Sequence, residues 1–403
     1  MKGFLRADGR KGIRNSVVVV YLVECAHHVA KTIVSKLDND DVQLIGFPGC
    51  YPNDYSLQMM EKLCTHPNVG GVLLVSLGCE GFNREKLSKT IIESGRPIET
   101  LVIQQCGGTK STIELGIEKS TSLLTNISNV ERIEIFTSDL VIGTICGGSD
   151  GTSGISANPA VGACFDLLLN ADATCIFEET GELIGCEQIM ANRAESPKLG
   201  QELIACVEKA ERYYTKMGYG SFAPGNAEGG LTTQEEKSMG AYAKSGSSNI
   251  NGIIKPGEIP HKKGLFLMDV VPDGEPMFGF PNISDNAEIV EMIASGALMI
   301  LFTTGRGSVV GSAISPVIKV CANPDTYERL SEDMDVNAGE IIKGLKTVNE
   351  IGDIIFENVL KVASGEKSKS EELGHKEFIL TYKKFDITGS PQKIESIGPS
   401  CLS

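Results

Sequence analysis

Tryptophan is absent from the 403-residue sequence, aromatic residues make up only 6%, and histidine occurs only five times. With so few aromatic side chains, a platform on which nucleic-acid bases stack is not expected. The histidines show no paired spacing such as HxxxH, which a histidine-based metal site would need. We therefore expect each of the five to be structural: His27, His28, His66, His261 and His375. The alternative for His27 and His28, at the start of the first predicted helix, is that they face a site at the strand end.

Long apolar runs and an excess of basic charge are also missing. The longest apolar run, residues 17–23, is far shorter than the roughly 20 residues that cross a bilayer. Charged residues throughout 1–15 argue against a signal peptide. The 37 Lys and Arg residues against 52 Asp and Glu give a net charge of −15, which argues against nucleic acid and anionic membranes as partners. These features predict a cytoplasmic protein.

The sequence contains neither a dinucleotide-binding motif nor a hydrolase motif, whereas cysteine and glycine are plentiful. No GxGxxG joins a strand to a helix and no GxSxG is present, so a nucleotide cofactor is not expected. The 12 cysteines of a cytoplasmic chain should be reduced thiols that serve as apolar fillers, nucleophiles or metal ligands. The 45 glycines indicate many tight turns and close backbone approaches.

Short β-branched runs alternate with amphipathic segments in the first third of the chain. The pattern predicts strands over residues 17–23, 42–47, 71–77 and 98–104, and helices over 24–37, 54–64, 83–94 and 109–126. Continuously apolar strands that alternate with helices are typical of a parallel sheet covered on both faces.

The pattern starts again after residue 130. Strands are predicted over residues 133–136, 141–145, 173–177, 264–269, 298–303 and 377–382, and helices over 158–170, 196–217, 285–294 and 338–363. We therefore expect an α/β protein of two doubly wound, mainly parallel-sheet domains packed together. The first is residues 1–130, and the second, residues 131–403, carries the loops Gly-Gly-Leu-Thr-Thr and Thr-Gly-Arg-Gly.

Four cysteines follow predicted strands, each beside glycine: Cys50, Cys79, Cys106 and Cys146. Ligands of open parallel sheets bind beyond the carboxyl ends of the strands. A thiolate at such a place can bind iron or zinc. Cysteine is also a small residue that suits a tight strand end, and no CxxC spacing decides between these interpretations.

Two glycine-containing loops are candidate anion sites. Gly229 and Gly230 precede Thr232 and Thr233 at the start of a predicted helix, where free backbone amides attract carboxylates, and Lys237 lies one turn further. The segment 303–308 places Thr304 and Arg306 after a strand, and an arginine fork there can bind a carboxylate. A capped helix without ligand and a salt-bridged turn are the structural alternatives.

Basic residues also gather at the amino terminus, where Arg6, Arg10 and Arg14 precede the first long strand. Dense cations in an acidic protein either bind an anionic partner or form a solvated basic arm.

Seven segments carry a family resemblance in the same order along nearly the whole chain. They are residues 6–15, 78–80, 146–160, 225–241, 264–269, 302–308 and 332–341. Together they resemble the large catalytic portion of the altronate and galactarate dehydratase family, which also includes the large subunit of sulfolactate sulfo-lyase. The resemblance implies a hydro-lyase that removes water from a sugar acid and yields a 2-keto-3-deoxy acid.

The resemblance also implies iron, as Fe²⁺ or an iron–sulfur cluster, or another divalent metal. Cys50, Cys79 and Cys146 are the candidate metal ligands, because each lies in a segment that matches the family. Candidates for holding the hydroxy-acid substrate are Arg306, Thr232, Thr233, Thr304, Arg10 and Arg14. Candidates for carrying protons are Lys237, Glu80 and Asp150.

Fuller members of the family carry a small β-rich domain before this portion, whereas this sequence opens almost directly at the segment 6–15. Either a separate small β-rich subunit supplies that domain or this protein works without it; we expect the separate subunit and a homo- or hetero-oligomer. Two alternatives stay open: a carbon–sulfur lyase subunit that releases sulfite from sulfolactate, and a non-catalytic subunit that binds a metabolite.

Overall fold

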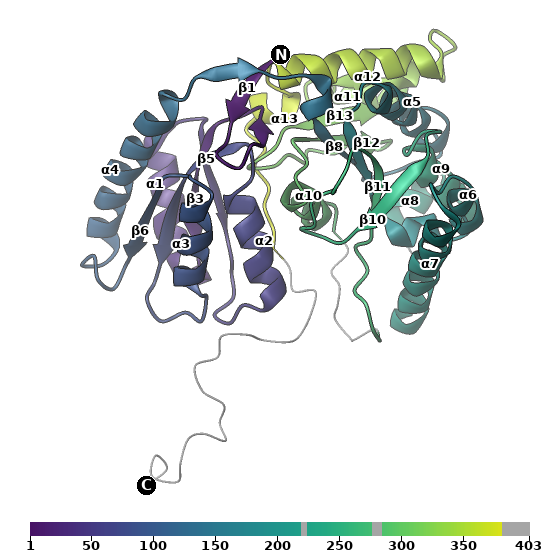
Figure 1. The fold of residues 1–403 in the computed structure, drawn as a ribbon. Helices are drawn as coiled ribbons and strands as arrows, with labels where there is room; N and C mark the ends of the chain where they lie inside the picture. The colour runs from purple at the N-terminus through teal and green to yellow at the C-terminus, as the bar shows by residue number, and fades with distance from the viewer. Residues whose placement is uncertain (219–223, 276–283, 381–403) are drawn as a thin grey trace, which may run out of the picture. The chain divides into compact units, whose positions relative to one another are not determined.

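The computed structural model describes residues 1–218, 224–275 and 284–380 (Figure 1). The chain forms two compact units. Within the described residues, the small unit comprises 16–65, 69–130 and 379–380, and the large unit comprises 1–15, 66–68, 131–218, 224–275 and 284–378. The residues before the first long strand therefore belong to the large unit.

The small unit is built on a four-stranded parallel sheet with the order β4-β3-β5-β6. Its strands are β3 (Ser16–Tyr21), β4 (Val42–Gly46), β5 (Val69–Ser76) and β6 (Ile98–Val102). Its helices are α1 (Glu24–Leu37), α2 (Asp54–Cys64), α3 (Arg84–Glu93) and α4 (Thr109–Ser128). Helix α1 packs against α4 and α2 against α3, and every residue of β5 is buried, as expected for a sheet covered on both faces.

The large unit is built on a seven-stranded sheet with the order β10-β11-β9-β8-β12-β13-β14, in which all neighbours are parallel. The strands are β8 (Val141–Cys146), β9 (Thr174–Phe177), β10 (Ile250–Ile254), β11 (Gly264–Met268), β12 (Met299–Thr304), β13 (Val317–Cys321) and β14 (Val336–Asn337). The order reverses between β8 and β12, which is where doubly wound sheets bind their ligands.

Helices cover this sheet, and α5 lies beside α12 (Figure 1). They are α5 (Ala157–Asn170), α6 (Glu187–Asn192), α7 (Pro197–Met217), α8 (Pro224–Glu228), α9 (Gln234–Ala243), α10 (Asp285–Ala294), α11 (Pro324–Arg329), α12 (Val348–Ala363) and α13 (Lys369–Glu372). Every helix among the described residues is too short or too polar to cross a membrane.

A small antiparallel sheet of β2 (Lys11–Gly12), β1 (Lys2–Leu5) and β7 (Arg132–Glu134) completes the large unit. The predicted strand 133–136 thus belongs to an antiparallel edge outside the main sheet. The predicted α/β class with parallel sheets is confirmed in both units.

Two predicted elements differ from the structure. The helix predicted over 338–363 is too long, because the chain forms a single 3-10 turn at Ala338–Glu340 and α12 begins only at Val348. Gly344 has a φ of +67°, and a capping box of Thr347 and Glu350 starts the new helix. In the strand predicted over 377–382, residues 377–380 are not extended in a sheet, and 381–382 lie outside the described residues.

Candidate active site

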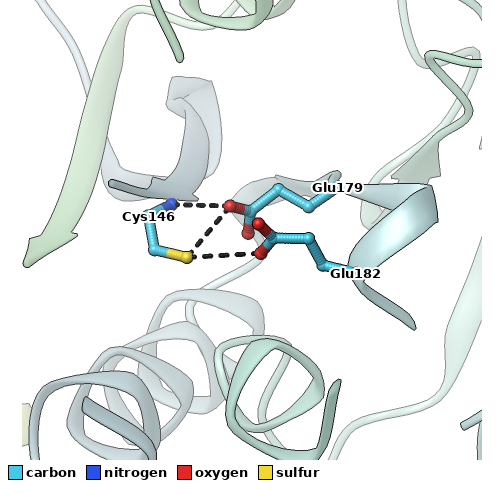
Figure 2. Close-up of side chains that lie close together, drawn as sticks. All are labelled: Cys146, Glu179 and Glu182. Carbon is cyan, nitrogen blue, oxygen red and sulfur yellow. Dashed lines mark hydrogen bonds between the residues drawn. The ribbon is translucent and has the colours of Figure 1, made fainter. Parts of the chain in front are cut away.

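Cys146 is the last residue of β8, at the point where the order of the large sheet reverses. It is buried, its backbone N–H donates to Glu179 Oε1 at 3.1 Å, and its thiol lies 3.0 Å from the same oxygen (Figure 2). The thiol also lies 3.5 Å from Glu182 Oε2. Both glutamates follow the neighbouring strand β9, one just before and one within the 3-10 helix Thr180–Leu183. Adjacent strand ends therefore bring one thiol and two carboxylates together.

Lys237, on the first turn of α9, faces this group. Its Nζ lies 3.0 Å from Cys146 Sγ and 2.5 Å from Glu182 Oε2, and only 4% of the residue is exposed. Burial favours the neutral amine, but the interactions with the Cys146 sulfur and the Glu182 carboxylate outweigh it and raise the pKa of Lys237 above its ordinary value. The lysine is therefore an ammonium ion in this arrangement.

A second lysine reaches the site from the same helix. Lys244, the C-cap of α9, forms a buried ion pair with Glu179. It follows Lys237 by seven residues, which is two helical turns, so both side chains project from one face of the helix. The helix begins where the Thr233 hydroxyl accepts the Glu236 backbone N–H, and this cap fixes the register that aims the lysines.

Further carboxylates, of which Glu178 is buried, surround the two lysines. Burial, and next the charge of Glu288, raise the pKa of Glu178 well above its ordinary value. Burial and the charge of Glu182 raise the pKa of Asp285 to about 6. On α10, Glu288 and Glu291 are buried, whereas Asp285 at the start of the helix is exposed at its surface. Carboxylates outnumber ammonium groups among these residues, so the site favours an added cation or added protons.

One thiol and two carboxylates form a donor set of the kind that binds metal ions. One ligand atom each from Cys146, Glu179 and Glu182 lies within 4.8 Å of the other two. We name these three residues the carboxylate–thiol cluster. A thiolate with two carboxylates suits iron(II) or zinc better than magnesium or calcium, which prefer oxygen ligands alone. The residues present therefore fit a divalent transition metal.

Of these three residues, the sequence pointed to Cys146 but not to the glutamates. Glu179 and Glu182 lie two and five residues after the predicted strand 173–177, so the strand-end argument applied to cysteine makes them candidates too, although it does not say which charged residues there are buried. Cys50 and Cys79 belong to the small unit and are exposed. The Gly81 N–H donates to the Cys50 carbonyl at 2.8 Å, which joins the loops after β4 and β5. Their role as metal ligands stays a prediction.

The other proposed proton carriers have structural partners. Asp150 is buried, and its carboxylate accepts hydrogen bonds from Thr152 and from Asn323 Nδ2. Glu80, in the small unit, accepts hydrogen bonds from the Ser76 hydroxyl and the Gly78 N–H. Catalytic roles for Asp150 and Glu80 stay predictions.

The predicted anion-binding loops lie beside the segment that follows Cys146. The Gly151 N–H donates to the Gly229 carbonyl at 3.0 Å, and the Arg306 N–H donates to the Gly148 carbonyl at 2.8 Å. The Arg306 guanidinium donates to the Gly225 carbonyl and lies 3.3 Å from Glu228, with 42% of its side chain exposed. The structure thus brings the Thr-Gly-Arg-Gly and Gly-Gly-Leu-Thr-Thr loops together around β8.

The three threonines of these loops have local partners. The N–H and hydroxyl of Thr232 donate to Glu236 Oε2, Thr233 caps α9, and Thr304 Oγ1 accepts the Gly307 N–H. These contacts shape the loops, and substrate binding by the threonines stays a prediction.

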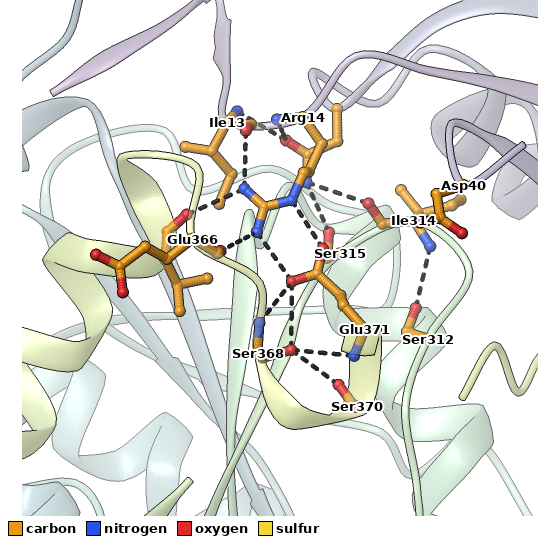
Figure 3. Close-up of polar contacts among 12 residues, drawn as sticks. Ile13, Arg14, Asp40, Ser312, Ile314, Ser315, Glu366, Ser368, Ser370 and Glu371 are labelled. Atoms are coloured by element: carbon orange, nitrogen blue, oxygen red, sulfur yellow. Dashed lines mark hydrogen bonds and ion pairs between the residues drawn. The ribbon is translucent and has the colours of Figure 1, made fainter. Parts of the chain in front are cut away.

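The amino-terminal arginines are engaged within the large unit. Arg10 forms an ion pair with Asp8 at 2.6 Å. Arg14 uses all five of its side-chain N–H groups, on two carbonyls of the segment 362–366, on the Ile13 carbonyl and twice on Glu371 (Figure 3). Arg14 therefore joins the amino terminus to the end of α12, to the turn after it and to α13. Substrate binding by Arg10 and Arg14 stays a prediction.

Comparisons with known proteins cover both units. Residues 137–385 match the family model described as D-galactarate/altronate dehydratase, C-terminal. Residues 3–128 match the model described as D-galactarate dehydratase/altronate hydrolase, second domain.

Three relatives illustrate the range of this similarity. The (2R)-sulfolactate sulfo-lyase subunit beta of Chromohalobacter salexigens is 33% identical over 94% of this chain and 96% of that protein. The galactarate dehydratase (L-threo-forming) of Escherichia coli strain K12 is 31% identical over 91% of this chain and 73% of that protein. The altronate dehydratase of Bacillus subtilis strain 168 is 28% identical over 94% of this chain and 77% of that protein.

Proposed function

Because the chain belongs to the galactarate and altronate dehydratase family, we propose that it is a lyase that removes water from a sugar acid to give a 2-keto-3-deoxy acid. Relatives named as dehydratases support elimination of water. The observation that carries the proposal is the buried carboxylate–thiol cluster with Lys237 beside it, at the strand ends where ligands of such sheets bind.

Elimination next to a carboxylate makes two chemical demands. Negative charge builds up when the C2 proton leaves, and hydroxide is a poor leaving group that must be stabilised. Cys146, Glu179 and Glu182 would hold iron, as Fe²⁺ or within a cluster, or another divalent metal. Such a metal, when bound, supplies a Lewis acid for the substrate carboxylate or the leaving oxygen.

Lys237 is the proposed proton carrier. As the neutral amine it would accept the C2 proton, and as the ammonium ion it would protonate the departing hydroxide to water. The raised pKa favours the ammonium ion, so delivery of the proton is the role that the arrangement supports best. Lys244 is already paired with Glu179 and would hold that carboxylate in place.

The exposed guanidinium of Arg306 is proposed to bind the substrate carboxylate, because its planar fork matches the two carboxylate oxygens. Thr232, Thr233 and Thr304, on the adjoining loops, would bind substrate hydroxyls. We further propose that the chain works in an oligomer with a small β-rich subunit, which is supported by the name of the relative called subunit beta.

The test uses anaerobic, iron-loaded protein with a panel of aldonates and aldarates that includes altronate and galactarate, with and without a small β-rich partner. Formation of a 2-keto-3-deoxy acid from a panel member is the expected result. Sulfite release from sulfolactate without any keto acid would replace the proposal with the carbon–sulfur lyase reaction. No product from either class of substrate, with or without the partner, would make the chain a non-catalytic subunit.

A further inference from the structure

A second polar group lies at the carboxyl edge of the large sheet, formed by Lys209, Lys255, Asp269 and Asp273, which we name the Lys–Asp cluster. Asp269 directly follows β11, Lys255 directly follows β10, and Lys209 comes from α7. Both ammonium groups bind one oxygen of the buried Asp269 carboxylate, at 2.5 Å from Lys209 and 2.7 Å from Lys255. The proposed reaction chemistry uses none of these residues.

One buried carboxylate cannot neutralise two ammonium ions. Because both nitrogens bind the same oxygen, they lie within roughly 5 Å of each other and repel. The second negative charge comes from Asp273, whose Oδ1 lies 2.8 Å from both nitrogens. The hydrogen bonds from the two lysines lower the pKa of Asp273 to about 2.

The two aspartates differ in how firmly they are held. The Asp269 side chain is fully buried, whereas 74% of the Asp273 side chain is exposed. Exposed ion pairs contribute little to stability, because both partners stay hydrated. An incoming anionic group can therefore replace Asp273 at the two ammonium ions while Asp269 stays paired. We propose that Lys209 and Lys255 form a binding subsite for an anionic group of the ligand, which Asp273 occupies in the free protein.

The position of this subsite indicates which ligand would use it. In the sheet order, β9 alone separates β8, which ends in Cys146, from β11, which precedes Asp269. Two strand spacings amount to about 10 Å. Thr180, the neighbour of Glu179, places its hydroxyl 3.5 Å from Asp269 Oδ1, so the two clusters adjoin. The roughly 10 Å between the two strand ends is comparable with the length of a six-carbon chain bound at both ends. It exceeds the length of a three-carbon sulfonate.

The assignment of a ligand to this subsite rests on the proposed function. If one carboxylate of the substrate reacts at the carboxylate–thiol cluster, the subsite holds the anionic group at the far end. The substrate is then a six-carbon dianion of the aldarate class, and a monoanionic aldonate of the same length leaves the subsite to Asp273.

The test measures dissociation constants of galactarate, a dicarboxylate, and altronate, a monocarboxylate, for the whole protein and three variants. Lys255→Met is expected to weaken galactarate binding about tenfold and altronate binding less than twofold. Asp273→Asn removes the internal competitor and is expected to tighten galactarate binding about threefold or more. Lys343→Met, which breaks a surface ion pair with Glu328, is the control and should change neither constant.

Opposite shifts in the Lys255→Met and Asp273→Asn proteins cannot arise from a general loss of folding. Equal affinity of the unaltered protein for both acids, or equal weakening of both by Lys255→Met, would overturn the subsite. Elimination of water from altronate with no preference for galactarate leaves the lyase proposal intact and refutes the subsite. Lysine-dependent galactarate binding without elimination from any sugar acid supports the subsite and refutes the lyase proposal.

Discussion

Lys237 combines burial with two anionic neighbours, which is the arrangement expected of a side chain that carries a proton in a reaction. Lys237→Met is expected to lower kcat at least 100-fold, because the proton donor is lost. Lys237→Arg keeps the charge but cannot exchange the proton, so it should lower kcat by a similar factor while restoring thermal stability. Steady-state kinetics with thermal unfolding of the same samples checks both variants.

Lys343→Met serves again as the matched control, since it removes a lysine from the surface of the same unit. A kcat within threefold of the unaltered protein in both Lys237 variants would make Lys237 a counter-ion of the cluster and nothing more.

At this scale the sequence singled out two of the five residues that meet at the candidate site. Cys146 and Lys237 were singled out by their glycine-rich surroundings, and the structure puts them 3.0 Å apart. Glu179, Glu182 and Lys244 were missed, because acidic and basic residues are common in loops and at helix ends. Nothing in the sequence alone tells which of them turn inward and are buried.

At the scale of elements, Arg14 ties the amino-terminal segment to the end of α12, to α13 and to the turn between them (Figure 3). Arg14→Met removes the guanidinium donor from the Glu371 carboxylate and from three backbone carbonyls. We expect a loss of roughly 2–3 kcal/mol in the free energy of unfolding, less than for a fully buried pair, because Arg14 and Glu371 are partly exposed.

Denaturant unfolding of Arg14→Met beside Arg10→Met measures this loss. Arg10 pairs with Asp8 in an exposed turn, so its replacement should cost less than about 1 kcal/mol. Equal stability of the two variants would contradict the anchoring role of Arg14.

Asp335 joins β13 to α13 by accepting the backbone N–H groups of Lys319 and Lys369. Burial raises its pKa from 3.8 to about 6. A carboxyl group with a raised pKa favours the folded state below the unfolded pKa, and this contribution is lost as pH rises through about 6. Asp335→Asn should therefore gain stability relative to the unaltered protein between pH 4 and pH 7, by up to about 3 kcal/mol.

The free energy of unfolding of both proteins, measured across that pH range, checks this prediction. Asparagine also changes the hydrogen bonds at this position. This changes the free energy of unfolding by an amount that does not vary with pH. A stability difference that is constant from pH 4 to pH 7 would show that Asp335 has an ordinary pKa.

Elements with strong periodicity were predicted within a few residues, as α1 and α2 illustrate. The strands β10 and β13 were missed for physical reasons. Asn251 and Gly252 interrupt β10, and both residue types are depleted in strands. In β13 a lysine, Lys319, occupies a fully buried position that sequence patterns assign to apolar residues. Burial of Lys319 lowers its pKa, which shows how far the fold overrides the pattern there.

At the scale of the whole molecule, alternation of strands and helices was enough to predict parallel α/β sheets. It could not predict the strand order, because the order depends on which crossover packs on which face. In the large unit that order puts β9 next to β8, and Glu179 and Glu182 join Cys146 for this reason. The proposed lyase activity depends on this grouping of residues by the strand order more than on any one motif.

The most direct test of the account is an anaerobic titration with Fe²⁺ that follows both bound iron and keto-acid formation. The unaltered protein should reach full turnover when the carboxylate–thiol cluster is filled. Cys146→Ser should lose iron affinity at least tenfold and lose turnover while keeping its fold, and Cys186→Ser, which alters a buried thiol outside the cluster, should match the unaltered protein. Iron binding and turnover that are the same in Cys146→Ser as in the unaltered protein would contradict the account.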